Sequence, residues 1–133
     1  MQFKECYQNP FIEERADPYI TLGPDGFYYF TASYPMKSAD DKDGYDRVIL
    51  RRAKDISELA SAEEITIWKV ADTTLTHRFI WAPELHYIAG LWYVFYAGSE
   101  DKENNWAFDC HVLVCDSNDP YTGCLLYTSP SPR

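Results

Sequence analysis

The feature that most constrains this chain is an internal repeat. The segment ADPYITLGPDGFYYFTAS (residues 16–33) can be laid over APELHYIAGLWYVFYAGS (residues 82–99). In each copy, a short turn with a proline and an acid leads into an apolar strand, a glycine-containing tight turn and an aromatic strand, which is the pattern of a β-hairpin. The turn glycines, Gly26 and Gly90, lie 64 positions apart. The chain therefore reads as two copies of one structural unit.

Each unit continues beyond its hairpin. A charged connection leads to a third strand, RVILRRAKDI in the first unit and HVLVCDSNDP in the second, and the first unit adds a fourth, AEEITIWKV. Four antiparallel strands per repeat are typical of a propeller blade, whereas a helical solenoid would need a period of 3.6 rather than 2. We expect an all-β fold with blade 1 at about 9–70 and blade 2 at about 71–123. Because a propeller needs about 4 to 8 blades, two blades cannot close its ring.

Composition limits the partners of the chain. The 133 residues hold 12 Lys and Arg against 21 Asp and Glu, a net charge of -9, which argues against nucleic acid. Aromatic residues make up 17%, a density that suits β structure and stacking on sugar rings. No leader peptide and no apolar run of membrane-spanning length is visible, which predicts a cytoplasmic protein without membrane contact, with secretion as the alternative.

Cysteine spacing gives no sign of a metal site. The four cysteines lack the paired short spacings of a zinc site, and CHVLVC, between Cys110 and Cys115, alternates like a strand. The acidic stretches SADDKDGYD and SEDKENN lack the spacing of a calcium-binding loop. We expect neither a metal nor a cofactor.

The last ten residues, CLLYTSPSPR (124–133), do not continue the blade pattern. They back-translate into a string that resembles a sequencing-library adapter read in one frame. We interpret them as adapter read-through joined to the native sequence, with a genuine Pro- and Ser-rich tail as the alternative.

One acidic residue stands where chemistry could occur. Asp17 precedes Pro18 at the start of the first strand, although Asp is a poor strand residue and Pro cannot donate to a ladder. The innermost strand of a propeller blade starts at one face of the central channel, so we expect this carboxylate at the channel mouth. The overlay puts Glu84, beside Pro83, at a roughly equivalent position in the second blade. The alternative is that Asp17 is simply a turn-forming residue with no chemical role.

The ordered elements RADP, RRAKDISEL, WAPE and DPYTG resemble glycoside hydrolase family 43, and its exo-α-1,5-L-arabinofuranosidase members most. The resemblance runs from about 9 to 123, with 1–8 as a lead-in. It implies the first two blades of a five-bladed β-propeller from an inverting glycosidase that removes terminal α-L-arabinofuranosyl residues. Asp17 matches the family's general base; its general acid and a pKa-tuning Asp lie beyond the second blade. We therefore expect the 133 residues alone to be inactive.

The resemblance also implies contacts with an arabinose- or xylose-containing oligosaccharide or polysaccharide. The expected substrate-binding residues are Trp81 as an apolar wall, Glu84 as a hydrogen-bond acceptor, Phe79, His77 and Tyr34. Core packing for Trp81 and a turn role for Glu84 are the structural alternatives. A β-xylosidase of the same family is the alternative activity, and a propeller that binds glycans without cleaving them is the alternative class.

Overall fold

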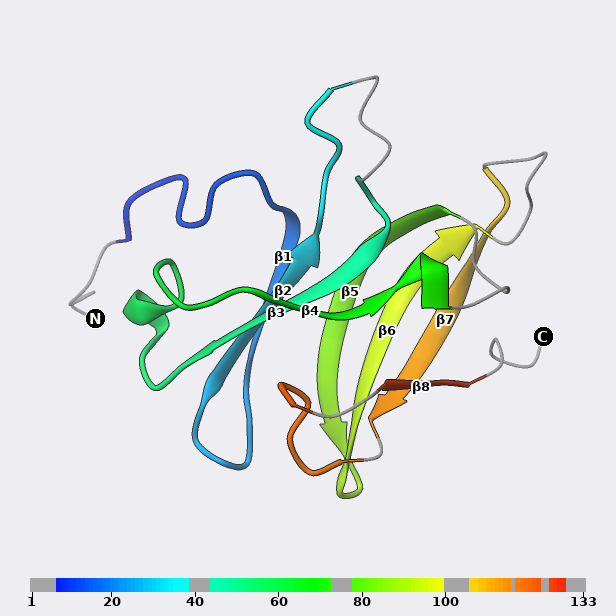
Figure 1. The fold of residues 1–133 in the computed structure, drawn as a ribbon. Helices are drawn as coiled ribbons and strands as arrows, with labels where there is room; N and C mark the ends of the chain where they lie inside the picture. The colour runs from blue at the N-terminus through cyan, green and yellow to red at the C-terminus, as the bar shows by residue number, and fades with distance from the viewer. Residues whose placement is uncertain are drawn as a thin grey trace, which may run out of the picture.

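The computed structural model describes residues 7–38, 44–72, 78–99, 106–115, 117–122 and 125–128. Its strands form two four-stranded antiparallel sheets, in the orders β1-β2-β3-β4 and β5-β6-β7-β8 (Figure 1). Strand order therefore follows chain order within each sheet, as the repeat predicted. Within the described ranges, no helix is long and apolar enough to cross a membrane.

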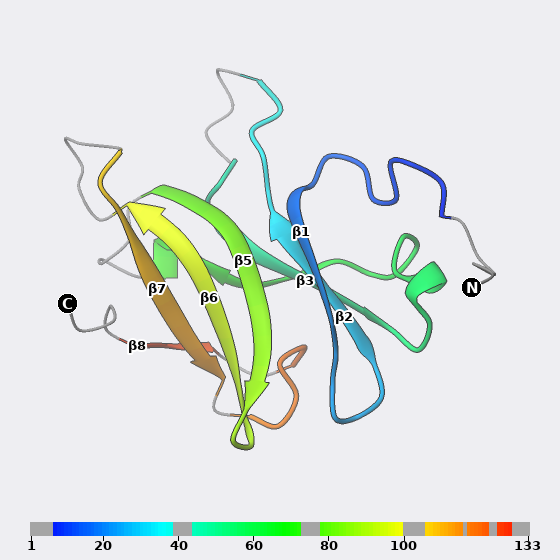
Figure 2. The ribbon, with the colours of Figure 1, turned by 180° about the vertical axis from the view of Figure 1, so that it is seen from behind.

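The first sheet contains β1 (Ala16–Leu22), β2 (Tyr28–Ser33), β3 (Arg47–Ala53) and β4 (Ile65–Lys69), and the second contains β5 (Arg78–Ile88), β6 (Leu91–Ser99), β7 (Phe108–Cys115) and β8 (Leu125–Thr128). Two short 3-10 helices, η1 (Ile56–Glu58) and η2 (Val70–Asp72), lie before and after β4. The view from behind in Figure 2 shows β1 and β5 as neighbouring inner strands, and both β1 and β2 contact β5. The two sheets are thus arranged as adjacent propeller blades.

The glycine turns form as expected. In the second hairpin, Ile88 pairs with Leu91, which leaves a two-residue turn of Ala89 and Gly90. Both turn residues have positive φ, 50° and 91°, as a type I′ turn requires. The first hairpin uses a longer turn in which Gly26 has a φ of 74°.

Two hydrophobic clusters explain why β2 and β3 are buried on both faces. β2 and β3 are buried on both sides, because alternate residues enter two different clusters. One cluster fills the space between the blades and includes Tyr29, Leu50, Trp92 and Tyr96. The other lies on the opposite face of the first sheet and includes Phe30, Ala32, Ile49, Ala53 and Leu59, with Phe11 and Ile12, which precede β1, packed against it.

A charged clamp joins the two blades. Arg52 of β3 donates from Nη1 to both carboxylate oxygens of Asp119, at 3.0 and 2.8 Å. Its guanidinium also lies 4.4 Å from the ring centroid of Tyr121. The RRAKDISEL and DPYTG elements therefore meet in space, although 67 positions separate Arg52 from Asp119.

Part of the tail forms the fourth strand of the second sheet. β8 (Leu125–Thr128) pairs antiparallel with β7. The blade thus has a fourth strand drawn from residues that the sequence reading set outside the fold. This pairing does not test where those residues originate, so the boundary at 124 remains a prediction.

Candidate functional site

The sequence-predicted residues gather at one end of the two blades. β1 and β5 both begin at this end, and β2 and β6 both end there (Figure 1). Asp17 and Tyr34 come from the first blade, and Phe79 and Trp81 come from the second. His77 lies outside the described residues.

A β-bulge presents Asp17. Ala16 pairs with Ser33 and Tyr19 pairs with Thr31, so two residues of β1 face one residue of β2. Asp17 takes a φ of 50°, which non-glycine residues seldom adopt. Its side chain is exposed, and Oδ2 accepts a hydrogen bond of 2.8 Å from Ser33 Oγ. The carboxylate is therefore open to solvent on one side and held on the other.

β5 contains two such bulges, one between Arg78 and Trp81 and one between Trp81 and Glu84, and the second corrects the expected equivalence of Asp17 and Glu84. Trp81 pairs with Ala97 and Glu84 pairs with Phe95, so two residues of β5 again face one residue of β6. The residue with positive φ there is Ala82, at 45°. Ala82 is thus the counterpart of Asp17. The overlay misplaced Glu84 because it aligned Ala16 with Ala82, whereas strand pairing puts Trp81 at the position of Ala16.

Glu84 makes its contact along the inner strands. Its Oε2 lies 2.9 Å from His86 Nε2, and His86 Nδ1 lies 3.4 Å from the hydroxyl of Tyr19 in the first blade. Half of the Glu84 side chain is exposed. With Ala82, Phe95 and other residues, Glu84 also lines an open hollow of about 350 Å³ on the second blade.

Trp81 belongs to a group of aromatic rings. It stacks on Phe108, with ring centroids 4.4 Å apart and planes at 22°, and lies 5.4 Å from Phe79. Trp106, which is 79% exposed, packs edge-on against it. Among the described side chains, Trp81 Nε1 is a buried donor without a partner. The ring cluster thus combines an exposed aromatic surface with an unused hydrogen-bond donor.

Tyr34 lies between two arginines. The guanidinium carbons of Arg15 and Arg47 are each 4.4 Å from its ring centroid. Its backbone carbonyl accepts a hydrogen bond from Tyr45 N, whose own carbonyl accepts one from Ile80 N. Tyr34 therefore has a clear packing role, whereas its expected contact with sugar remains a prediction.

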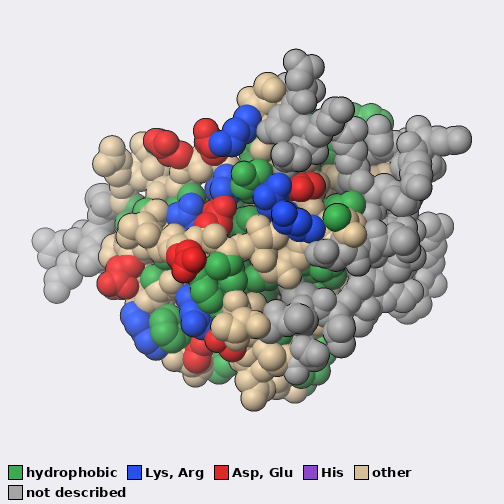
Figure 3. Space-filling view, viewed as in Figure 1, with side chains coloured by type: hydrophobic (Ala, Val, Ile, Leu, Met, Phe, Trp, Pro, Cys, Tyr) green, Lys and Arg blue, Asp and Glu red, His purple; other side chains and the backbone are tan. Residues whose placement is uncertain are grey.

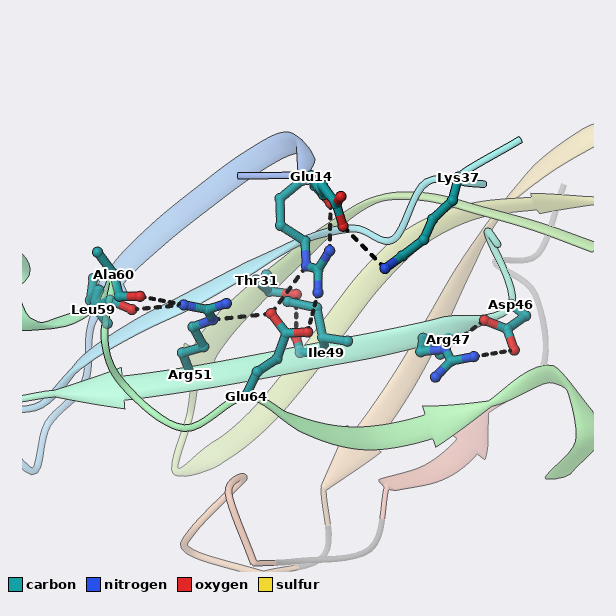
Figure 4. A network of polar contacts seen from close by, with 11 residues as sticks. Glu14, Thr31, Lys37, Asp46, Arg47, Ile49, Arg51, Leu59, Ala60 and Glu64 are labelled. Carbon is teal, nitrogen blue, oxygen red and sulfur yellow. Dashed lines mark hydrogen bonds and ion pairs between the residues drawn. The ribbon is translucent and has the colours of Figure 1, made fainter. Parts of the chain in front are cut away.

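A partly buried carboxylate anchors the strand entrance. Arg15, two residues before Asp17, donates to both oxygens of Glu64. Arg51 Nε donates to Glu64 Oε2 at 3.0 Å, and Figure 4 shows this pair. Arg51 also donates to the backbone carbonyl of Ala60 at 2.8 Å. Burial alone would raise the pKa of Glu64, but the hydrogen bonds and charges of both arginines outweigh it and hold the pKa below its ordinary value.

The surface over these elements carries mixed charge. On the face in Figure 3, acidic and basic side chains of the described residues alternate rather than form a patch of one sign. Among the described residues, no group of three or more His, Cys, Asp or Glu side chains could hold a metal ion. In β7, Cys110 is exposed, while His111 is buried with Nε2 3.2 Å from the Gly98 carbonyl.

Comparison with known proteins identifies the family. Residues 7–125 match the profile of Glycosyl hydrolases family 43, and the chain belongs to this family. It is 42% identical over 117 residues to an extracellular exo-α-(1→5)-L-arabinofuranosidase of Streptomyces avermitilis, a match that covers 88% of this chain and 22% of the relative. A protein of the same name from Streptomyces chartreusis is 41% identical over 117 residues, covering 88% of this chain and 33% of the relative.

A comparison with solved structures supports the same family. The crystal structure of α-L-arabinofuranosidase from Lactobacillus brevis superposes with a TM-score of 0.75 at 36% identity, over 93% of this chain and 38% of that one. The two sheets are therefore blades of a β-propeller. The chain spans between a fifth and a third of the length of the two Streptomyces relatives. Both relatives have names that include "extracellular", so they do not support the expected cytoplasmic location.

Sequence reasoning missed Ser33 and Glu64. Nothing local distinguishes Ser33 from other serines, because its role depends on the pairing of β1 with β2 and on β5 beside them. Glu64 follows another glutamate in a polar turn, and only the fold shows that it is the less exposed of the two. The arginines in RAD and RRAK were the available signal, since partly buried arginines require an anionic partner.

Proposed function

We propose that the protein containing this chain is an inverting glycosidase that removes terminal α-L-arabinofuranosyl residues from arabinan or arabino-oligosaccharides, with Asp17 as its general base. Support comes from family membership, from relatives named arabinofuranosidases and from the geometry around Asp17. The substrate is an arabinose-containing carbohydrate.

One observation carries the role of Asp17. The carboxylate is joined through the Ser33 hydroxyl to the backbone N–H of Ala82, the residue after Trp81, with both hydrogen bonds 2.8 Å long. The RADP and WAPE elements are thus next to each other at one end of the blades. The acid would offer a base, and the aromatic rings a stacking surface, to one sugar.

The chemistry follows from inversion. An inverting glycosidase holds its two carboxyl groups about 6.5–9.5 Å apart, so that a water molecule fits between the base and the anomeric carbon. Asp17 would accept a proton from that water as the oxygen attacks. A general acid on a later blade would protonate the leaving oxygen. Because the two carboxyl groups come from different blades, the 133 residues alone should not turn over substrate.

The test compares two matched substitutions in the full-length protein. Asp17→Asn removes the base with little change in shape and should lower kcat about 10²–10⁴-fold on a 1,5-linked arabino-oligosaccharide. Asp25→Asn makes the same change in the first hairpin turn, at the far end of the sheet, and should keep kcat. Proton NMR of the first product formed should show inverted anomeric configuration.

Two results would contradict the proposal. Retention of most of kcat by Asp17→Asn would remove Asp17 as the base. Binding of arabino-oligosaccharide by the wild-type protein without any product would favour the non-catalytic glycan-binding alternative.

A further inference from the structure

The hydroxyl of Ser33 can make its two hydrogen bonds in only one direction. The backbone N–H of Ala82 can only donate, so Ser33 Oγ must accept there. The hydroxyl proton is then left for Asp17 Oδ2, and an ionised carboxylate can only accept. The Ser33 side chain is fully buried. The donors and acceptors on either side of Ser33 therefore fix the direction of this relay.

The relay joins the bulge of β1 to the bulge of β5 that contains Ala82. Asp17 and Ala82 both have positive φ, at 50° and 45°. Ser33, which pairs with the residue before Asp17, connects the carboxylate of the first bulge to the backbone of the second. The orientation of the carboxylate thus depends on how the second blade docks against the first.

The second blade shows that the bulge does not need this pair of side chains. In the bulge between Trp81 and Glu84, Ala82 stands at the position of Asp17, and Ala97, opposite the residue before the bulge, stands at the position of Ser33. In the bulge between Arg78 and Trp81, these positions hold Phe79 and Ser99, again without an acid. The same backbone therefore forms with two alanines. The bulge of β1 therefore does not need Asp17 and Ser33 in order to fold. The remaining role for this pair is the hydrogen bond by which Ser33 holds the Asp17 carboxylate.

We propose that Ser33 is a positioning residue for Asp17, holding one carboxylate oxygen through a hydroxyl that is itself fixed by the second blade. This proposal rests on the proposed function, in which Asp17 is the base. Held at Oδ2, the carboxylate cannot rotate freely about its terminal torsion, and Oδ1 is left to face the attacking water. Because a misplacement of about 1 Å can cost about 10²-fold in rate, loss of this contact should act on kcat.

The test uses four variants of the full-length protein. Ser33→Ala removes the relay and introduces the residue that the second blade already has at this position. Thr31→Val is the matched control, because Thr31 is also buried on β2 and its Oγ1 donates to the Ile49 carbonyl at 2.8 Å, away from Asp17. Asp17→Asn and the Asp17→Asn/Ser33→Ala double variant complete a cycle.

Ser33→Ala should lower kcat about 10–100-fold with KM changed less than about threefold, while Thr31→Val keeps kcat at a similar thermal midpoint. In the Asp17→Asn background, Ser33→Ala should cause no further loss, because there is no base left to position. If Ser33→Ala does not fold, Ser33→Cys, with similar volume and a weak S–H donor, replaces it.

The outcomes separate the two proposals. Equal kcat for Ser33→Ala and Thr31→Val, together with an inactive Asp17→Asn, overturns the role of Ser33 and leaves the function standing. A loss from Ser33→Ala that is just as large in the Asp17→Asn background also overturns it. An active Asp17→Asn overturns the proposed function itself, whatever Ser33→Ala does.

Discussion

Glu64 provides a prediction that the structure makes quantitative. Its side chain is 17% exposed, and those of its partners Arg15 and Arg51 are 12% and 15% exposed. Removing one partner of a buried ion pair costs about 3–5 kcal/mol, whereas an exposed pair contributes about 0–1 kcal/mol. Glu64→Gln leaves two shielded guanidinium groups without a carboxylate. Since this site is mostly buried, we expect a loss of about 2–3 kcal/mol in the free energy of unfolding at pH 7.

The pH dependence has a definite sign. Because the arginines hold the folded-state pKa of Glu64 below its ordinary value of 4.5, the stabilisation is complete above the unfolded-state pKa and is lost as pH falls through the folded-state pKa. The difference between wild type and Glu64→Gln should therefore shrink below about pH 4. Urea unfolding from pH 7 to pH 3 measures both quantities. Glu63→Gln, the same change at the exposed neighbour, should stay within about 0.5 kcal/mol.

The reasoning about Glu64 fails on either of two results. If Glu64→Gln costs no more than Glu63→Gln at pH 7, the carboxylate is not holding the two arginines. If the difference between wild type and Glu64→Gln is the same at pH 3 as at pH 7, the stabilisation does not depend on ionised Glu64.

Two further substitutions test the joint between the blades and the packing beside the site. Arg52→Met keeps the aliphatic contacts but removes the charge from Asp119. The ion pair is about one-third exposed, so Arg52→Met should lower the free energy of unfolding by about 1–2 kcal/mol. The control Lys54→Met, on the exposed surface, should lower it by less than about 0.5 kcal/mol. Urea unfolding measures both values, and equal losses would contradict the role of Arg52 as a clamp between the blades. Tyr34→Phe keeps the ring between its arginines and should leave KM unchanged in a steady-state assay, whereas a rise above about fivefold would place its hydroxyl on the sugar.

The parts of the fold that the sequence predicted are those that depend on local pattern. The period of two and the turn glycines act within a hairpin, so Gly90 and its two-residue turn could be read directly. Strand register is different, because one extra residue in a bulge shifts all later partners. The identity of Ala82 as the counterpart of Asp17 could therefore only emerge from the pairing of β5 with β6.

The candidate site divides in the same way. Asp17 and Trp81 stand in short motifs and were found from the residues and their resemblance. Ser33 lies 16 positions from Asp17 and 49 from Ala82, and no local signal links the three. Contacts that cross between blades leave no periodic trace in the sequence, because each partner sits in its own strand pattern.

The motif elements that lie away from Asp17 have a physical role in this arrangement. Arg51 secures Glu64, which holds Arg15 two residues before the acid, while Arg52 fixes the second blade through Asp119. The first contact sets where β1 begins, and the second limits how the blades turn against each other. Since the Ser33 relay spans the same joint, both contacts constrain the carboxylate that would act as the base. In the proposed mechanism, the chemistry at one end of the blades would thus depend on ion pairs that lie away from the sugar.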